Sequence, residues 1–395
     1  MKRILSIVLI SCFLFASSSS AAPSLIPVKE LKLLADIGNI EEINGVVTSG
    51  NAIVIYGTKF GKSYARAINN LGEELWKVDL DPQSQSLATA ATADTSGNIW
   101  ISGSISADIP GPASTPSLTP LNPDNVISMP QDVDSSLRNI VLWQIDQNTH
   151  AISKYLLPQA LPVLITSMAL DKNGVSISGI ASTSNGNSGF VLSANLHGEF
   201  GTLLTFGNKS TTLDSIIRNS DGSLTAVGSS SETLGGKKLI GLTDGVIIKI
   251  AKNGSILSVV RSSAAKASRN WKSASSSFLL GGEVLTGNKT ESAVTKFSST
   301  YDPTWTHRFA STGLTFTSGA TYAFFASTGQ ISEIAKWAPK SARPLLLAFD
   351  AKGRIVGGYS APTNQREVIG LASSKVFGLL CVSASKDLVS IFSIN

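Results

Sequence analysis

The chain has 395 residues, of which 42% are hydrophobic and 15% charged, and its formal net charge is +5. This hydrophobic content excludes a largely disordered chain, and the ordinary glycine and proline content excludes a collagen-like protein. Lysine and arginine form no run longer than the pair Lys237-Lys238. We therefore expect no nucleic-acid partner, because such binding needs clustered basic residues.

The first 21 residues predict a secretory signal peptide. Lys2 and Arg3 precede an apolar stretch at 4–15, and small residues follow at 16–22. A segment of this kind directs export and is then removed. We place the start of the mature chain at Ala22 and expect a secreted or extracytoplasmic protein. No stretch of the sequence is long and apolar enough to predict a transmembrane helix.

Residues 9–12 also allow a second interpretation, in which Cys12 is acylated and anchors the protein to a membrane. Because the apolar run continues for three residues past Cys12, we favour cleavage before Ala22. Cys381 is then the one cysteine left in the mature chain. It allows neither an intramolecular disulfide nor a zinc cluster.

A short β-rich run that closes on glycine recurs along the chain. It stands at 53–57, 99–103, 175–179, 224–228 and 278–282, with degenerate copies at 323–327 and 377–381. A second series has a hydrophobic residue, a short polar turn and a glycine, and it ends at Gly72, Gly198, Gly254 and Gly353, with weaker versions near Thr149 and Tyr301. Both series keep the same order, and most intervals are about 45 to 55 residues, which predicts a tandem array of one unit.

Each unit can be written as four strands, for example at 215–219, 224–228, 245–250 and 256–260. Four-stranded units at this period predict an all-β fold, a seven-bladed β-propeller of four-stranded antiparallel blades that forms a single domain over 22–395. One longer interval is explained by a Pro/Ser-rich insertion loop at 105–138. A pair of β-sandwiches is the alternative.

The last unit is incomplete, since strands are predicted at 367–373, 376–383 and 388–394 before the chain stops. We expect the N-terminal residues 31–36 to supply its fourth strand and close the ring, because an open sheet would expose edge hydrogen bonds. The alternative is an N-terminal helix with Leu31, Leu34 and Ile37 on one face.

The segments 67–76, 244–254 and 348–353 resemble the repeats of bacterial secreted β-propeller proteins of the SBBP and pyrroloquinoline-quinone-like type. The resemblance implies a secreted propeller. In the quinoprotein pattern every blade carries a tryptophan that docks onto its neighbour, whereas here Trp76 and Trp305 alone fall near that position. We therefore expect no quinone and no other cofactor.

Long connections are predicted at 105–138, 181–188, 229–244 and 328–343, all on one face of the ring, while the turns of the other face are tight. Binding residues concentrate on long loops that a rigid scaffold supports. The candidate ligand-binding residues on that face are Glu42, Asp214, Arg269, Arg366, Lys237, Lys238, Asp244 and Trp337. For Trp337 the alternative is a place on the hydrophobic face of a short helix with Ile331 and Ile334.

Motifs for catalysis are missing from the sequence, which has no serine-nucleophile signature, phosphate loop or paired histidine ligands. His150, His197 and His307 are expected at or near third-to-fourth strand turns, as surface residues. The aspartate-containing turns at 94–97, 171–174 and 220–222 lack the ligands of a calcium loop. We therefore expect no catalytic residue and no metal site.

Together these features predict a secreted, non-catalytic binding module with a protein or polysaccharide partner on the long-loop face. The alternative is an extracytoplasmic enzyme, a lyase or glycan hydrolase, that uses Asp or Glu residues of the same face.

Overall fold

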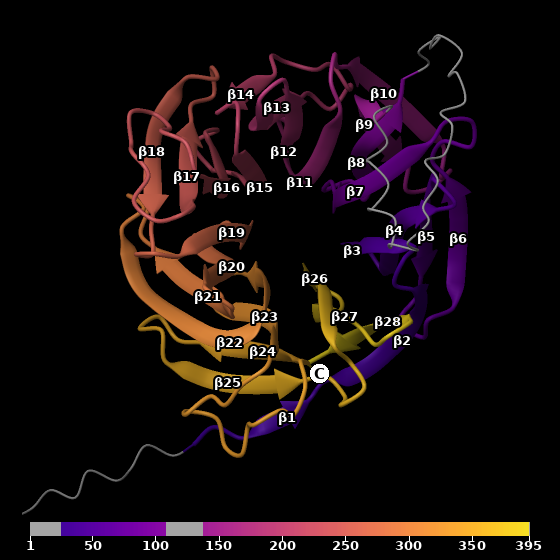
Figure 1. The fold of residues 1–395 in the computed structure, drawn as a ribbon. Helices are drawn as coiled ribbons and strands as arrows, with labels where there is room; N and C mark the ends of the chain where they lie inside the picture. The colour runs from indigo at the N-terminus through magenta and orange to yellow at the C-terminus, as the bar shows by residue number, and fades with distance from the viewer. Residues whose placement is uncertain (1–24, 108–136, 395) are drawn as a thin grey trace, which may run out of the picture.

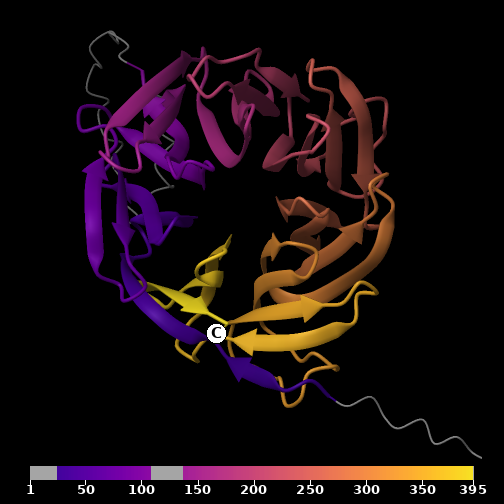
Figure 2. The same ribbon diagram turned by 180° about the vertical axis from the view of Figure 1, so that it is seen from behind.

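A computed structural model describes residues 25–107 and 137–394 of the chain. Within these residues all regular secondary structure is β, and the sheets follow one another around a ring (Figure 1, and from behind in Figure 2). The proposed signal peptide at 1–21, the alternative lipid anchor at Cys12 and most of the insertion at 105–138 lie outside the described residues. No helix in the described part of the chain has the length and apolar character that a membrane span requires.

Five sheets have four strands each, joined in simple antiparallel order. The first contains β3 (Ile43–Ser49), β4 (Ala52–Lys59), β5 (Lys62–Ile68) and β6 (Glu74–Asp79). The second contains β7 (Ser86–Ala93), β8 (Ile99–Ser106), β9 (Leu137–Ile145) and β10 (Ile152–Pro158). The third contains β11 (Val163–Asp171), β12 (Gly174–Thr183), β13 (Gly186–Ala194) and β14 (Leu204–Phe206). The fourth contains β15 (Thr211–Arg218), β16 (Leu224–Ser230), β17 (Asp244–Ile250) and β18 (Ile256–Ser262).

The next sheet has eight strands, because one long strand belongs to two groups of four and a further short strand is added at one edge. It contains β19 (Ser268–Ala274), β20 (Leu279–Thr286), β21 (Lys289–Phe297), β22 (Pro303–Ser318), β23 (Tyr322–Ser327), β24 (Arg343–Phe349), β25 (Ile355–Ser360) and β1 (Val28–Glu30). The first half of β22 pairs with β21 and its second half with β23. At the far edge β1 pairs with β25 in parallel, so this sheet is mixed.

The last sheet joins the two ends of the described chain. It contains β26 (Glu367–Ser374), β27 (Gly378–Ala384), β28 (Leu388–Ser393) and, from the N-terminal region, β2 (Lys32–Asn39). β2 pairs antiparallel with β28, from Lys32 opposite Ser393 to Asn39 opposite Leu388. The N-terminal segment is therefore a strand in this sheet, and the alternative of a helix there is wrong.

An irregularity interrupts the innermost strand of each group of four. In β3, β7, β11, β15 and β19 one extra residue shifts the register, at Asn44, Thr89, Thr166, Asp214 and Lys272. In β26 one extra residue shifts the register between Val368 and Gly370. The second half of β22 is interrupted between Ser311 and Thr315, where three residues lie opposite one residue of β23. Such bulges bend a strand and increase its twist.

The recurring glycines of the first sequence series lie opposite these bulges. A Cβ atom at Gly57, Gly103, Gly179, Gly228 or Gly282 would overlap the backbone carbonyl oxygen of Glu42, Leu87, Leu164, Thr212 or Asn270 respectively. The carbonyl of the residue two positions before each extra residue therefore lies against the glycine of the next strand. The repeat needs glycine here because the backbones approach too closely for any side chain.

The second sequence series marks the third-to-fourth turns, where a residue with positive φ recurs. These residues are Gly72, His150, Gly198, Gly254, Tyr301 and Gly353. The weaker copies near Thr149 and Tyr301 are thus the same turn with a non-glycine residue in the left-handed conformation. A Cβ atom at Gly198 or Gly353 would overlap Tyr155 or Trp305 of the preceding sheet's outer strand, and His150 stacks on Trp76 with ring centroids 4.9 Å apart.

Strand pairing separates the two faces of the ring. In the fourth sheet, Ser230 at the end of β16 lies opposite both Thr211 and Asp244, at the starts of β15 and β17. We call this end, with the second-to-third connections and the links between sheets, the long-loop face, and the other end the tight-turn face. The connections at 231–243 and 328–342 are long as predicted. A long loop at 181–188 is wrong, because Thr183 pairs with Gly186 and closes a tight hairpin turn.

The core lies between neighbouring sheets as well as within them. Trp100, Ile140 and Leu142 of the second sheet share one buried cluster with Ile177 and Phe190 of the third. Trp100, Trp143 and Trp271 are among the largest fully buried side chains. Stability therefore depends on face-to-face packing around the ring, with each sheet covered by its two neighbours.

Replacing Gly228 by alanine should test the contact at the bulge. The new methyl group would displace the Thr212 carbonyl and lower the free energy of unfolding by about 3 kcal/mol, the upper end for overpacking. Denaturant unfolding measures this. Gly201→Ala is the matched control, since its Cβ would meet nothing closer than 3.4 Å, and it should change stability little. Equal stability of the two variants would contradict this account of the repeat.

Deleting residues 22–39 should expose the edges of β28 and β25, which β2 and β1 cover. An uncovered edge strand recruits other chains, so we expect a lower melting temperature and aggregation, measured by circular dichroism and light scattering. Deletion of 22–24 alone should leave both properties unchanged. A monodisperse 22–39 deletion variant with the parent's melting temperature would show that β2 is dispensable.

Candidate functional site

The eight predicted ligand residues lie toward the long-loop face, but they do not form one cluster. Glu42 and Arg366 precede the inner strands β3 and β26, and Asp214 and Arg269 lie in β15 and β19. Asp244 begins β17, Lys237 and Lys238 lie in the 231–243 connection, and Trp337 lies in the 328–342 connection. Burial separates them into structural residues and accessible ones.

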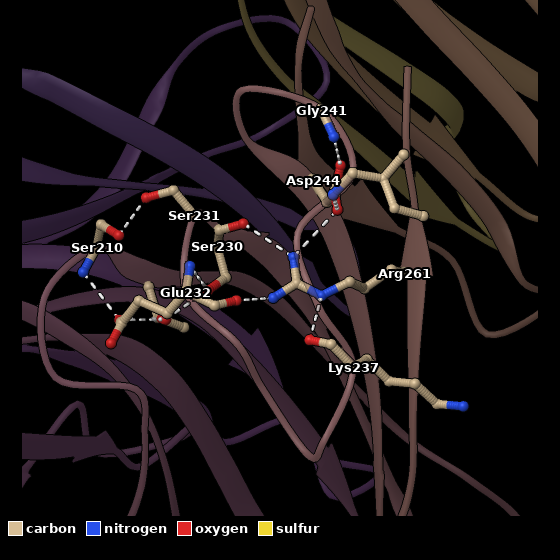
Figure 3. A network of polar contacts seen from close by, with 10 residues as sticks. Ser210, Ser230, Ser231, Glu232, Lys237, Gly241, Asp244 and Arg261 are labelled. Atoms are coloured by element: carbon tan, nitrogen blue, oxygen red, sulfur yellow. Dashed lines mark hydrogen bonds and ion pairs between the residues drawn. The ribbon is translucent and has the colours of Figure 1, made fainter. Parts of the chain in front are cut away.

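Asp244 is a structural residue at the base of the 231–243 loop (Figure 3). Its side chain is fully buried, and Arg261 of β18 lies 3.2 Å from its Oδ2. The backbone amides of Ile240 and Gly241 each donate to its carboxylate at 2.9 Å. Burial by itself would raise the pKa of Asp244, but these amides and Arg261 lower it below its ordinary value. The prediction that Asp244 contacts a ligand is therefore wrong.

Arg261 holds the rest of the loop base. Its Nε donates to the carbonyl of Lys237 at 3.0 Å, its Nη1 donates to the carbonyl of Ser230 at 3.2 Å, and its Nη2 donates to the carbonyl of Glu232. A planar guanidinium can bridge several acceptors in this way because its donors point in fixed directions. The loop is thereby fixed to its own sheet by one buried side chain.

Glu232 joins the loop to the link that precedes β15 (Figure 3). Its carboxylate accepts the backbone amides of Asn208, Lys209 and Ser210 at 2.9 to 3.1 Å. Burial opposes ionisation, but these amides and the Thr211 hydroxyl lower the pKa of Glu232 to about 2. The carboxylate is therefore ionised and fully engaged, so it provides no free charge at the loop surface.

Two further predictions fail because the side chains are buried. Trp337 is 5% exposed in a cluster with Ile331 and Ile334, and its indole Nε1 donates to Ser327 Oγ at 3.0 Å. The sequence alternative for Trp337 is thus correct in its partners, although the segment is not a helix. Arg269 is 8% exposed, donates to Ser262 Oγ at 3.1 Å, and lies over the ring of Trp271.

Asp214 belongs to the contacts between inner strands. It is the extra residue of the β15 bulge, and the extra residue of β19, Lys272, lies 3.0 Å from its carboxylate. Other bulges make equivalent contacts: Asn44 donates to the Ala88 carbonyl at 2.6 Å, and Thr166 donates to the Leu213 carbonyl at 2.5 Å. The ion pair of Asp214 therefore ties one sheet to the next.

Four of the predicted residues stay accessible: Glu42, Arg366, Lys237 and Lys238. Arg366 donates to the carbonyls of Thr363 and Gln365 in its own loop. Lys237 and Lys238 are exposed beside three apolar side chains, Leu239, Ile240 and Leu242, of which Ile240 is 72% and Leu242 65% exposed. The loop thus has a fixed base and an exposed tip, residues 237–242, which is both apolar and basic.

Glu42 lines a hollow of about 460 Å³ between β2 and the first sheet. Its carboxylate lies 3.0 Å from Lys59 Nζ, and its backbone carbonyl accepts the Tyr64 hydroxyl at 3.3 Å. Arg66 reaches across the hollow to the carbonyl of Ile37 in β2. The hollow therefore lies where the N-terminal strand meets the first sheet, and it is lined mainly by charged and aromatic side chains.

Phe60 stands at the rim of this hollow and is 92% exposed. It forms the β4–β5 turn with Gly61, and both residues have positive φ, 49° and 74°. A bulky residue in the left-handed region costs of order 1 kcal/mol, and water exposure of a phenyl ring adds to that cost. Strain of this kind is concentrated at functional sites, which makes Phe60 a candidate contact residue of this face.

The sequence reasoning missed Lys59, Phe60, Lys62, Tyr64 and Arg66. A signal was available, because the Phe60-Gly61 pair stands between two lysines where a tight turn normally has asparagine, aspartate or glycine. The contribution of β2 to the hollow had no signal in the local sequence.

A larger hollow, of about 620 Å³, lies on the rim between β22 and β25 and contains none of the eight predicted residues. Trp305 and His307 line it together with Leu25 and Ile26. His307 lies within β22 rather than in a turn, and its Nε2 is 2.6 Å from the Gly353 carbonyl. His150 and His197 lie in third-to-fourth turns as predicted.

The described residues contain no group of three or more His, Cys, Asp or Glu side chains that could hold a metal ion. Cys381 is buried in β27, and burial raises the pKa of its thiol far above the ordinary value. A thiol held protonated in this way is a poor nucleophile and a poor metal ligand.

The pKa of Glu232 leads to a prediction about acid stability. Its pKa in the folded protein is about 2 against an ordinary value of 4.5, so its contribution to stability is present above pH 4.5 and is lost as the pH falls toward 2. In Glu232→Gln this component should be missing, and the melting temperature should fall less steeply over that range. Glu199→Gln, on the tight-turn face, should retain the parent's slope. Identical slopes for parent and Glu232→Gln would contradict the prediction.

Neither a protein-family profile nor a curated protein matches this sequence. Among solved structures, the chain is similar to the β-propeller domain of the Trilobed protease from Pyrococcus furiosus, which has an open velcro topology; the identity is 8% over 91% of this chain and 95% of that chain, with a TM-score of 0.51.

Sqt1 from Chaetomium thermophilum, bound to the N-terminus of the ribosomal protein L10, is 12% identical over 92% of this chain and 100% of that chain, with a TM-score of 0.49. The WD40 domain of Toxoplasma gondii coronin is 9% identical over 94% of this chain and 89% of that chain, also with a TM-score of 0.49. At these identities the comparison with the protease domain supports the fold alone. The chain has an all-β propeller fold built from four-stranded sheets.

Proposed function

We propose that this chain is an extracytoplasmic, non-catalytic binding module that receives a saccharide chain in the hollow beside Glu42. The signal-peptide pattern at 1–21 supports the location. We place the binding surface on the long-loop face, because binding residues concentrate where a rigid scaffold carries long connections.

We infer that the ring has seven blades and that β2 closes it. The seven interruptions of inner strands, from Asn44 in β3 to Ile369 in β26, support this number. With β22 divided between two blades, each blade has four antiparallel strands and one interruption of its inner strand, and β1 is a fifth strand on the blade that ends with β25. The pairing of β2 with β28 supports closure, since it brings the N-terminal strand into the last blade.

The exposed ring of Phe60 carries the functional proposal. A sugar ring can lie on an aromatic face while its hydroxyl groups bond to polar side chains around it, and ligand sites combine apolar surface with a few placed polar groups in this way. Lys62 makes no ion pair among the described residues, and Lys77 lies over the Tyr64 ring instead. Both ammonium groups are thus available to hydroxyl or carboxylate groups of a ligand.

The carboxylates of the long-loop face argue for binding rather than hydrolysis. Glycan hydrolysis needs two carboxyl groups, one of which stays protonated because its pKa is raised. Here Glu42 pairs with Lys59, Asp214 with Lys272 and Asp244 with Arg261. Asp244 and Glu232 both have lowered pKa values, the reverse of what a general acid requires.

Affinity electrophoresis against peptidoglycan fragments and acidic and neutral surface polysaccharides tests the proposal. At least one polymer should retard the protein, and Phe60→Ala should weaken that interaction about tenfold or more, as expected for an aromatic anchor. Leu71→Ala is the control, because Leu71 is also highly exposed but lies in a third-to-fourth turn on the tight-turn face.

Binding to no polymer, or equal binding by Phe60→Ala, would contradict the saccharide proposal. Release of new reducing ends from a bound polymer would favour the alternative, a lyase or glycan hydrolase.

A further inference from the structure

We propose that the 231–243 loop docks the long-loop face onto an anionic lipid bilayer surface. The inference uses the working face but not the hollow at Glu42, so it stands independently of the saccharide proposal. It rests on three features of the loop: exposed apolar side chains, a fixed conformation and an excess of positive charge.

The apolar side chains are exposed although the loop backbone is held in place. Leu239 is 36%, Ile240 72% and Leu242 65% exposed. Meanwhile the amides of Ile240 and Gly241 bond to Asp244, and the amide of Leu242 donates to the Ala267 carbonyl at 2.9 Å. A flexible loop could turn such side chains inward, but this backbone is anchored on both sides of them. The apolar surface is therefore presented to whatever lies beyond the face.

The composition of the tip suits lipid better than a protein partner. Protein interfaces take most of their binding energy from tryptophan, tyrosine and arginine, and lysine is depleted at their centres. The tip has none of those three residue types. It has Lys237 and Lys238 next to three aliphatic side chains, the combination that inserts apolar groups below lipid headgroups while ammonium groups contact phosphates.

The tip of the loop carries positive charge. Glu232 is engaged with backbone amides and Asp244 is buried, so the tip carries two lysine charges and no free carboxylate. On the other long connection Lys336 and Lys340 outnumber Glu333. On the tight-turn face the carboxylates that fix the turns, for example Asp221 and Asp350, are paired with basic residues of the same face. An anionic surface would attract the lysines of the tip and so bring the long-loop face toward it.

Vesicle co-sedimentation tests the proposal, with vesicles of phosphatidylglycerol and phosphatidylcholine in equal parts compared with pure phosphatidylcholine. The protein lacks residues 1–21 in this experiment, so that the apolar stretch at 4–15 cannot insert; every described strand begins after that segment. We expect binding to the anionic vesicles that weakens with salt, and little binding to the neutral ones.

Ile240→Ser/Leu242→Ser should lower the partition coefficient at least about tenfold, since each side chain would bury apolar surface. Lys237→Gln/Lys238→Gln should lower it roughly tenfold at low salt. Ile256→Ser/Leu257→Ser is the matched control, because these residues of β18 are 53% and 57% exposed in the same sheet but outside the loop. It should bind as the parent does, and all variants should keep the parent's melting temperature.

Failure of the parent to bind anionic vesicles, or equal binding by Ile240→Ser/Leu242→Ser, would overturn the proposal. Loss of vesicle binding in the control would also overturn it, because the apolar contact would then lie elsewhere. Phe60→Ala should keep vesicle binding, so failure of the saccharide proposal and failure of this one are separable.

Discussion

The fold depends on a close backbone contact near the axis of the ring. At each bulge of β3, β7, β11, β15 and β19, a carbonyl oxygen turns toward the next strand and lies against a glycine Cα. The bulge bends the inner strand, and the glycine allows the neighbouring strand to follow without steric overlap. The extra residue then points toward the adjacent sheet, where Asn44, Thr166 and Lys272 make contacts between blades. One local irregularity thus accounts both for strand curvature and for the bonds between neighbouring sheets.

The tight-turn face is fixed by the opposite ends of the same strands. Turns with positive φ place Gly198 and Gly353 directly under Tyr155 and Trp305 of the preceding sheets. Trp76 and Trp305 thus pack against His150 and Gly353 in the turns of the blades that follow them, and Tyr155 takes this place beside Gly198. Little space remains at these turns for larger side chains, whereas the connections of the long-loop face differ widely in length.

Periodic features of the sequence predicted most of the fold, because glycines at bulges and turns are needed whatever the packing around them. The N-terminal strand was also predictable, since the last unit lacked a partner for β28. Individual site residues were harder to predict from the sequence. Asp244 and Trp337 stand in long connections, yet one is neutralised by Arg261 from a different strand and the other is covered by Ile331 and Ile334. Nothing in the local sequence distinguishes a loop residue that anchors from one that is free.

The 231–243 loop shows why anchoring and exposure belong together. Its polar residues, Glu232, Asp244 and Arg261, satisfy backbone groups and one another, which leaves the apolar tip without internal partners. Phe60 is exposed in the same way at a turn whose backbone conformation is set by pairing of Lys59 with Lys62. In both places the scaffold determines the position of the side chain. The entropic cost of ordering the loop is therefore met during folding and not on binding. A partner that contacts these side chains therefore gains their burial without having to order the loops, which is the physical basis of pre-organised recognition.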